Sequence, residues 1–278
     1  VVYIPLGVLG VALGTFLSQI ISAGLVLLSL TKTTQIYHLN LRKISFDMAM
    51  LRRIVVIGIP AGLQSVMYSI SNIIIQSSIN TFGTDAAAAW TAYGKIDGFF
   101  WMIMSAFGVA ITTFSGQNFG AGRYDRIHKS VWTCMGMSAG TAVFMSTILY
   151  FWGGVVYRMF TPDEAVIQQG MVMMRLLVPF YITYVAIEII SGAVRGAGDS
   201  ILPMIITCVG ICVLRVGWIM LAVPVWRDIS TVCYSYPITW SITSVAFLVY
   251  YFHGGWLRKR IQKMEELTAQ SERENQSF

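Results

Sequence analysis

Seven long apolar segments, separated by short polar turns, are the feature of this sequence that most limits its fold. Each segment has about twenty residues or more, enough for a helix to cross the ~30 Å hydrocarbon core of a membrane. Only 12% of the residues are charged, about half the share that is usual in soluble domains. We therefore predict an all-α polytopic membrane protein with seven transmembrane helices, in the segments 3–30, 54–80, 86–115, 131–157, 166–194, 202–225 and 229–256.

Lysines and arginines gather at one set of segment ends, which predicts how the helices cross the membrane. Of the 19 cations, 14 lie in the turns and tails of one side, and two, Arg158 and Arg227, lie on the other. The remaining three, Lys95, Arg175 and Arg215, lie inside apolar segments. Because cytoplasmic turns are enriched in Lys and Arg, we expect the basic side and the C-terminus in the cytoplasm. We expect a multi-pass protein of the cell membrane, in a bacterial plasma membrane.

The polar stretch 31–53 separates the first apolar segment from the other six. It is basic, and its apolar residues recur at helical spacing, continuing into the next segment: Leu41, Ile44, Met48, Leu51 and Val55. This pattern predicts an amphipathic helix that lies on the membrane surface. A solvated linker without a helix is the alternative.

The second apolar segment carries a stripe of polar residues. Its members recur at every fourth position and so follow a slowly winding face of a helix: Gln64, Tyr68, Asn72, Gln76 and Asn80. They either line a water-accessible cavity, which we favour, or bind neighbouring helices. Tyr184 and Arg215, in later segments, are further candidates for lining a substrate cavity.

Charged residues inside the apolar segments are the candidates for coupling to an ion. Lys95 and Asp97 lie in the third segment, where a charge is costly and usually faces a cavity or a partner. Glu188 is the only Glu within a segment. Because burial disfavours a charged carboxylate, Glu188 either takes up H⁺ or Na⁺ or forms a fixed ion pair with Arg215 or Arg175.

Two glycine-rich stretches follow long apolar segments. The first leads into a basic patch, and the second surrounds an Arg-Gly pair. Because glycine accepts the positive φ angles that sharp reversals need, both stretches are predicted to form turns on the cytoplasmic side. The residues expected in these turns are Gly116, Gln117, Gly120, Gly122, Arg195 and Gly196.

The same stretches resemble those of a known family. Residues 114–124, FSGQNFGAGRY, are similar to the signature after the eighth helix of MATE (multidrug and toxic compound extrusion) transporters. Residues 191–200, SGAVRGAGDS, are similar to the Arg-Gly turn after the tenth helix of that family. The resemblance implies two six-helix lobes around a central cavity, which export lipophilic, often cationic, compounds in exchange for Na⁺ or H⁺.

This resemblance also assigns the parts of the chain. Residues 1–30 would hold the last helix of the first lobe, 31–53 a cytoplasmic linker between the lobes, 54–257 the second six-helix lobe and 258–278 a cytoplasmic tail. The sequence begins at Val1 and lacks a signal-peptide pattern. We therefore expect a missing N-terminal lobe of the same protein to be its main protein partner.

The sequence departs from the family pattern at two places. Many members carry an acid in the seventh helix, where this chain has only the polar stripe from Gln64 to Asn80. The position of the tenth-helix acid of some members is occupied by Tyr184, and Glu188 lies one helical turn further on. The coupling ion could therefore bind elsewhere, including in the first lobe.

Other functions have less support in the sequence. A flippase for lipid-linked oligosaccharides, from the same superfamily, would share the glycine stretches, and a non-transporting membrane protein is a further alternative. No Ser-His-Asp set is visible, and the three histidines lie near segment ends. We expect no enzyme activity, no metal site, no cofactor other than the coupling ion and no nucleic-acid partner. The expected partners are small organic substrates and membrane lipid.

The cation count predicts that Tyr124, just beyond the first glycine stretch, lies in the cytoplasm. A cysteine that replaces Tyr124, with the four native cysteines removed, should not react with a membrane-impermeant thiol reagent added outside intact cells. Ready labelling from outside would reverse the predicted topology. Permeabilised cells, in which the cysteine should react, provide the control.

Overall fold

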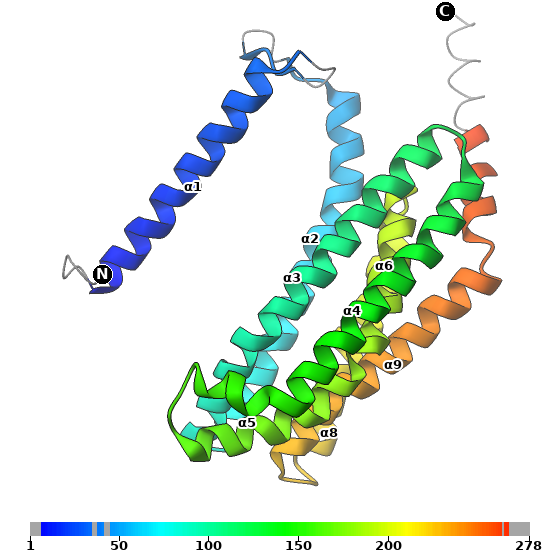
Figure 1. The fold of residues 1–278 in the computed structure, drawn as a ribbon. Coiled ribbons are helices and arrows are strands. Elements are labelled where there is room, and N and C mark those ends of the chain that lie inside the picture. Colours follow the sequence, from blue (N-terminus) through cyan, green and yellow to red (C-terminus); the bar gives the residue numbers. More distant parts are fainter. Residues whose placement is uncertain (1–6, 35–37, 42–44, 263, 267–278) are drawn as a thin grey trace, which may run out of the picture. The chain divides into compact units, whose positions relative to one another are not determined.

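The computed structural model describes residues 7–34, 38–41, 45–262 and 264–266. Within these residues it contains seven helical segments that are long and apolar enough to cross a membrane, and no strand. This confirms the predicted all-α membrane fold. Five of the spans are continuous helices. The other two each contain a turn of a different helix type (Figure 1).

The uninterrupted spans are α1 (Gly7–Lys32), α2 (Met48–Asn80), α3 (Thr84–Gly120), α4 (Tyr124–Arg158) and α9 (Ile229–His253). The fifth span consists of α5 (Glu164–Leu177), the 3₁₀ turn η2 (Val178–Phe180) and α6 (Tyr181–Gly196). The sixth consists of α7 (Ile201–Thr207), the π-helical turn η3 (Cys208–Val213) and α8 (Leu214–Ala222).

The chain divides into two compact units, residues 1–53 and 54–278. The first contains α1 and the stretch for which we expected a surface helix. No separate surface helix forms in the described part of this stretch, since residues 33–34, 38–40 and 45–47 are not helical and residues 48–53 already belong to α2. Ile44, which contributed to that expectation, lies outside the described residues. Asp47 instead caps the start of α2, where its side chain accepts hydrogen bonds from the backbone N–H groups of Ala49 and Met50. The cap begins a new helix at Met48, which leads directly into the next span.

The fifth span changes helix type at Pro179. Proline has no N–H to donate and its ring clashes with the preceding turn, and the 3₁₀ turn η2 forms around it. Interruptions are expected on the same ground at Pro60 and Pro237 but do not occur, because α2 and α9 run continuously through these prolines. The π-helical turn η3 has no proline, and no pattern in the sequence predicts it.

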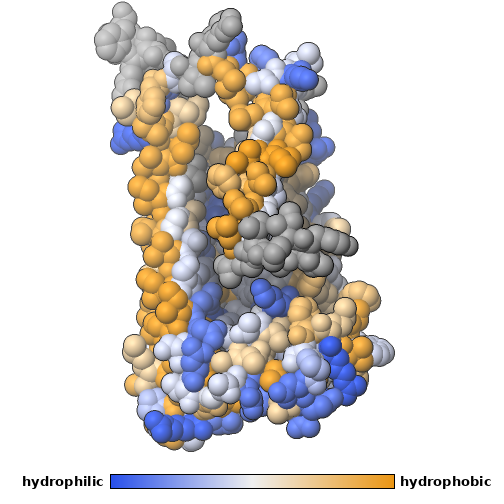
Figure 2. Space-filling view, turned by 90° about the vertical axis from the view of Figure 1, so that its left-hand side faces the viewer, coloured by the Kyte–Doolittle hydropathy of each residue, from blue (hydrophilic) through white to orange (hydrophobic). Residues whose placement is uncertain are grey.

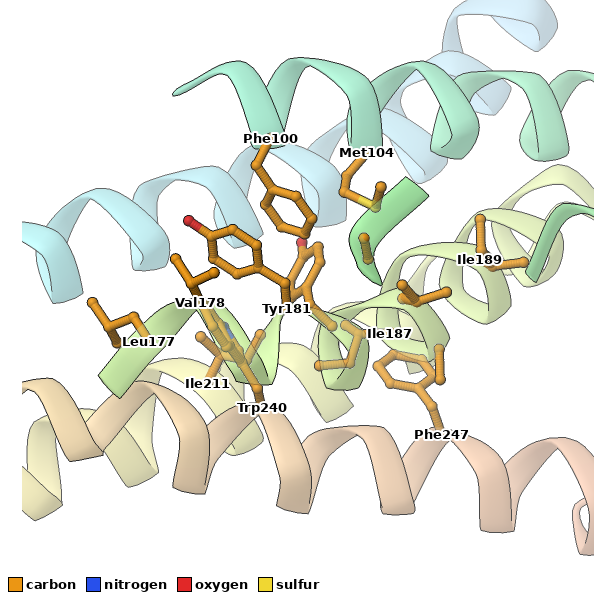
Figure 3. Packing of buried hydrophobic residues seen from close by; sticks show 14 of the residues in the cluster. Phe100, Met104, Leu177, Val178, Tyr181, Ile187, Ile189, Ile211, Trp240 and Phe247 are labelled. Atoms are coloured by element: carbon orange, nitrogen blue, oxygen red, sulfur yellow. The ribbon is translucent and has the colours of Figure 1, made fainter. Parts of the chain in front are cut away.

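The second unit is built around α6, which lies beside α3, α4 and α9 (Figure 1). Aromatic side chains from three of these helices meet at its first turns. The rings of Phe100 on α3 and Tyr181 on α6 stack with their centres 3.9 Å apart. Trp240 on α9 also contacts Tyr181, with ring centres 6.2 Å apart and the ring planes inclined at 56°. Figure 3 shows α3 and α9 both directing large side chains toward α6.

Further along, α3 and α6 approach so closely that glycine is required on both. A Cβ atom on Gly196 would lie 3.1 Å from the backbone nitrogen of Gly116 and would collide with the carbonyl of Thr112. A Cβ on Gly192 would lie 3.1 Å from the carbonyl of Gly108. The Thr112 hydroxyl also bonds across the contact, donating to the carbonyl of Gly192 at 3.1 Å. Small residues allow this kind of backbone contact between membrane helices.

The predicted glycine turns are therefore corrected. Most of the six residues expected there are helical: Gly116, Gln117 and Gly120 in α3, and Arg195 and Gly196 in α6. The first reversal occupies only 121–123, where Gly122 has a φ of 68°. The second has Gly198 at a φ of 88°. Gly116 and Gly196 serve helix contact rather than chain reversal, whereas a Cβ on Gly120 would meet nothing within 4 Å.

The end of α6 is capped by a residue from the far end of the chain. Arg260, in the helical stretch 256–262, donates from Nε to the carbonyl of Ala197 and from Nη2 to the carbonyl of Gly198, both at 2.9 Å. Ala197 and Gly198 directly follow the last residue of α6, so the guanidinium satisfies carbonyl acceptors at this helix end. Arg260 thus joins the basic C-terminal stretch to the α6 turn.

The outer faces of the helices stay apolar. In α2, for example, Leu63, Val66 and Ile73 are 53%, 54% and 68% exposed. The face shown in Figure 2 carries hydrophobic residues along the helices and hydrophilic residues toward their ends. This distribution suits a surrounding of lipid between two aqueous layers.

The close contact of α3 and α6 predicts a size limit at Gly196. Gly196→Ala should lower the free energy of unfolding by roughly 1–3 kcal/mol, because the added methyl group meets backbone atoms that cannot move aside. The unfolding midpoint in detergent measures this. Gly140→Ala is the matched control, since a Cβ there has nothing within 4 Å, and it should not be destabilised. Equal midpoints for both variants would contradict the backbone contact.

Candidate functional site

A cavity of about 640 Å³ opens among the helices of the second unit. Its lining residues come from α2, α3, α6, α8 and α9, and most are polar or aromatic. Two carboxylates, one guanidinium and seven aromatic side chains contribute to its wall: Asp97, Glu188, Arg215, Tyr68, Trp90, Tyr93, Trp101, Tyr184, Tyr236 and Trp240. Drug-sized ligands usually bind in cavities of ~300–1,000 Å³, so the volume is sufficient for an organic molecule.

Asp97 on α3 is held only by uncharged donors among the described residues. Its Oδ1 accepts from the Tyr181 hydroxyl at 2.5 Å and from the Tyr93 hydroxyl at 3.4 Å, and its Oδ2 accepts from the Trp101 ring N–H at 2.5 Å. The two tyrosine hydroxyls lie 3.0 Å apart. No Lys, Arg or His of the described chain lies within salt-bridge distance of Asp97.

Glu188 on α6 has a charged neighbour on its own helix. Its Oε1 lies 3.8 Å from Nη2 of Arg195, and its Oε2 accepts from the Tyr184 hydroxyl at 3.1 Å. Seven residues are nearly two helical turns, so Arg195 and Glu188 share a face. The carboxyl group packs directly on Gly108 of α3, where a Cβ atom would lie 2.9 Å from the Glu188 Cδ.

The ion pair considered for Glu188 from the sequence is therefore corrected. Neither Arg215 nor Arg175 is its partner in the described structure. Arg175 is exposed at the end of α5, and Arg215 is engaged elsewhere. Helical periodicity would have indicated Arg195, but we assigned that residue to a turn.

Arg215 on α8 is 2% exposed and reaches the cavity between aromatic side chains. Its guanidinium carbon lies 3.9 Å above the centre of the Tyr236 ring. Its Nη2 donates to the Thr239 hydroxyl at 3.2 Å, whereas its buried Nε has no hydrogen-bond partner. Tyr236 is absent from the residues that we expected at the site, because an aromatic residue in an apolar segment is usually a packing residue.

Most of the polar stripe of α2 lies at cavities. Tyr68, Asn72 and Gln76 line the main one. Gln64 and Tyr68 line a second cavity of about 270 Å³, which also reaches Glu188 and Arg195. The last member of the stripe is bonded within the helix, because Gln76 donates from Nε2 to Oδ1 of Asn80 at 2.9 Å.

Lys95 does not join these residues. It is exposed and does not line either cavity, although its neighbours Gly94 and Asp97 line the larger one. Tyr93 and Trp101, which bond to Asp97, were not among the predicted site residues. Their spacing of four residues on each side of Asp97 places all three on one helical face, and this pattern is the signal that could have found them.

Metal binding has no visible centre in the part of the chain that the structure describes. No group of three or more His, Cys, Asp or Glu side chains there is placed to hold a metal ion. The absence of a cofactor other than the coupling ion stays a prediction.

The bonds of Asp97 predict a specific loss on removing one hydroxyl. Tyr181→Phe keeps the ring stack on Phe100 but removes the shortest O–H donor from the half-buried carboxylate of Asp97. We expect the free energy of unfolding to fall by roughly 1–3 kcal/mol, measured as a lower unfolding midpoint in detergent. Tyr234→Phe is the control, since Tyr234 is 45% exposed. A midpoint for Tyr181→Phe that equals that of the control would contradict the assigned bonds.

Comparison with known proteins gives consistent results. The probable multidrug resistance protein YoeA of Bacillus subtilis is 21% identical over 263 residues, covering 93% of this chain and 57% of the relative. The probable multidrug resistance protein NorM of Thermotoga maritima is 23% identical over 210 residues, covering 76% of this chain and 45% of the relative. This chain thus spans about half the length of the curated relatives it matches.

A solved structure shares the fold. The outward-facing structure of a multidrug resistance MATE family transporter superposes with a TM-score of 0.81 at 19% identity, over 94% of this chain and 58% of the solved one. The family model described as MatE matches residues 60–220, which include α3 and α6 and nearly every residue of the cavity. This chain is therefore a member of the MATE family of membrane transporters.

Proposed function

We propose that this chain is part of a secondary antiporter that exports lipophilic or cationic organic compounds in exchange for H⁺ or Na⁺. The observation that carries the proposal is the placement of two carboxylates, Asp97 and Glu188, in one aromatic-lined cavity among membrane helices. A buried acid inside a membrane domain usually marks an ion or substrate pathway. The names of the curated relatives, which describe multidrug resistance proteins, support the class of substrate.

Asp97 is the better candidate for exchange between an ion and a substrate. Its hydrogen bonds come from Tyr181, Tyr93 and Trp101, which orient the carboxyl group without neutralising its charge. A bound proton, a sodium ion or the cationic group of a substrate can each supply the missing positive charge. Because two of these cannot occupy one carboxylate together, binding of one favours release of the other.

Glu188 has a second role in this proposal. Arg195 already faces its carboxylate, so the charge is partly balanced by the protein itself. Because Glu188 packs on Gly108 and bonds to Tyr184, its protonation state is coupled to the contact of α3 and α6. We assign Glu188 to positioning, as a link between the cavity and the helix contact, with ion binding centred on Asp97.

The larger architecture remains part of the proposal. We assign α1 to the last helix of a first lobe, 31–53 to the cytoplasmic linker, 54–257 to the second six-helix lobe and 258–278 to a cytoplasmic tail. The division of the chain after Arg53 and the greater length of the relatives, of which the match covers 57% in YoeA, support this assignment. The basic ends of the spans support a cytoplasmic location for the C-terminus, and the remaining lobe would be the principal partner.

Neutral replacement of the two acids tests the assignment of the ion site. In everted membrane vesicles that contain the full-length protein, ion-driven uptake of ethidium should fall at least about tenfold in Asp97→Asn, since the replacement cannot exchange an ion. Glu188→Gln should lower the unfolding midpoint, because Arg195 is left without its partner. The same variant should retain ion-dependent uptake.

Asp85→Asn provides the matched control, because Asp85 lies exposed in the first turn of the same helix, and it should transport normally. Ethidium binding to purified Asp97→Asn is the second control. Retained binding shows that the variant is folded and has lost only ion coupling. Wild-type ion dependence in Asp97→Asn would remove Asp97 from the mechanism, and complete loss in Glu188→Gln alone would transfer the role to that residue.

A further inference from the structure

The positive charge of Arg215 has no counter-ion among the described residues. No carboxylate lies within salt-bridge distance of it. The two acids of the same cavity are engaged elsewhere, Asp97 by Tyr181 and Trp101 and Glu188 by Arg195. A buried charge inside a membrane domain is expensive unless it is paired, so an arginine in this position calls for an explanation.

The backbone fixes this guanidinium at the cavity. The π-helical turn η3 ends two residues before Arg215, and π-helical turns occur often at functional sites because they re-orient the side chains that follow. Gly210 within η3 packs so tightly on Thr243 of α9 that a Cβ atom would come within 3.0 Å of the Thr243 Cβ. α8 is thereby held against α9, the helix that supplies both Tyr236 and Thr239.

The contacts of Arg215 orient the group without satisfying it. Stacking on Tyr236 covers one face, and Thr239 accepts one hydrogen bond from Nη2. Nε keeps a donor with no acceptor, in a residue that is 98% buried yet lines the cavity. A guanidinium has five N–H donors in a planar fork that matches the two oxygens of an anionic group.

We propose that Arg215 forms an anion-binding subsite, which takes the carboxylate or sulfonate group of an aromatic organic ligand. The anionic group of the ligand pairs with the guanidinium of Arg215. The aromatic part of the ligand packs on the rings of Trp90 and Trp240, which line the same cavity. This inference rests on the proposed function to the extent that the cavity is the substrate site. It extends the range of ligands from cationic and neutral compounds to anionic ones.

The aromatic stack strengthens the subsite. Because Tyr236 covers one face of the guanidinium, its edge is the part left for an incoming group, and planar two-point bonding uses that edge. Asn72 and Gln76 of α2 line the same cavity and carry amide N–H donors that an anion can also use. The remaining charges of the cavity, Asp97 and the pair of Glu188 with Arg195, are not needed for this step.

A matched pair of probes tests the subsite directly. Equilibrium dialysis with the purified full-length protein compares 2-naphthoate with 2-naphthamide, which has the same ring but no charge. Wild-type protein should bind naphthoate at least about tenfold more tightly, as expected for a charge-assisted bond to a buried guanidinium. Arg215→Gln should lose this preference while binding naphthamide normally, and Arg215→Lys should retain part of it.

Controls separate the possible outcomes. Arg175→Gln removes an exposed arginine outside the cavity and should keep the preference for naphthoate. Inorganic phosphate and chloride, added as competitors, distinguish a subsite for organic anions, which they displace weakly, from a general anion site. A wild-type protein without preference, or a preference that survives in Arg215→Gln, would overturn the proposal.

The comparison of the two probes on wild-type protein needs no variant. It therefore tests the anion subsite even if Arg215→Gln does not fold. Ion-driven transport of ethidium by the same purified protein, reconstituted into lipid vesicles, separates this inference from the proposed function. If wild-type protein exports ethidium but shows no preference for naphthoate, the anion subsite alone is rejected. If wild-type protein does not export ethidium, the antiporter is rejected.

Discussion

The backbone contact between α3 and α6 is the constraint on which the rest of the second unit depends. Gly196 and Gly116 meet with no room for a side chain on Gly196, and Thr112 bonds across the contact. In a membrane, helices gain little from hiding apolar surface from lipid that is equally apolar, and close packing and interhelical hydrogen bonds take over that role. The glycines therefore add a close backbone contact to the buried hydrophobic residues that pack around α6.

The same contact builds the cavity. Toward the start of α3 large side chains face α6: Phe100 stacks on Tyr181, and Asp97 bonds to both Tyr181 and Trp101. The two helices thus touch at one end and are held apart by aromatic rings at the other. Glu188 lies between these regions, on Gly108, so a change in its contacts affects both the packing and the cavity. We infer that ion binding and helix movement are linked at this place.

The sequence predicts the spans well because apolar length is a property of the chain itself. Proline alone does not predict where the spans break, because the helix type changes at Pro179 but α2 and α9 continue through Pro60 and Pro237. The sequence fails where a feature depends on a neighbour. Gly116 resembles a turn residue until α6 is placed beside it, and Arg195 pairs with Glu188 only once α6 is known to continue to Gly196. The hydrogen bonds of Asp97 required Tyr181, a residue 84 positions away.

The central claim is that an ion and a substrate compete for the carboxylates of one cavity, with Asp97 as the main site. Its most direct test is ion release on substrate binding. Ethidium added to purified full-length protein in weakly buffered detergent solution, with and without Na⁺, should release protons or bound Na⁺ from the wild type and none from Asp97→Asn. Binding of ethidium to wild-type protein with no release of either ion would contradict the account.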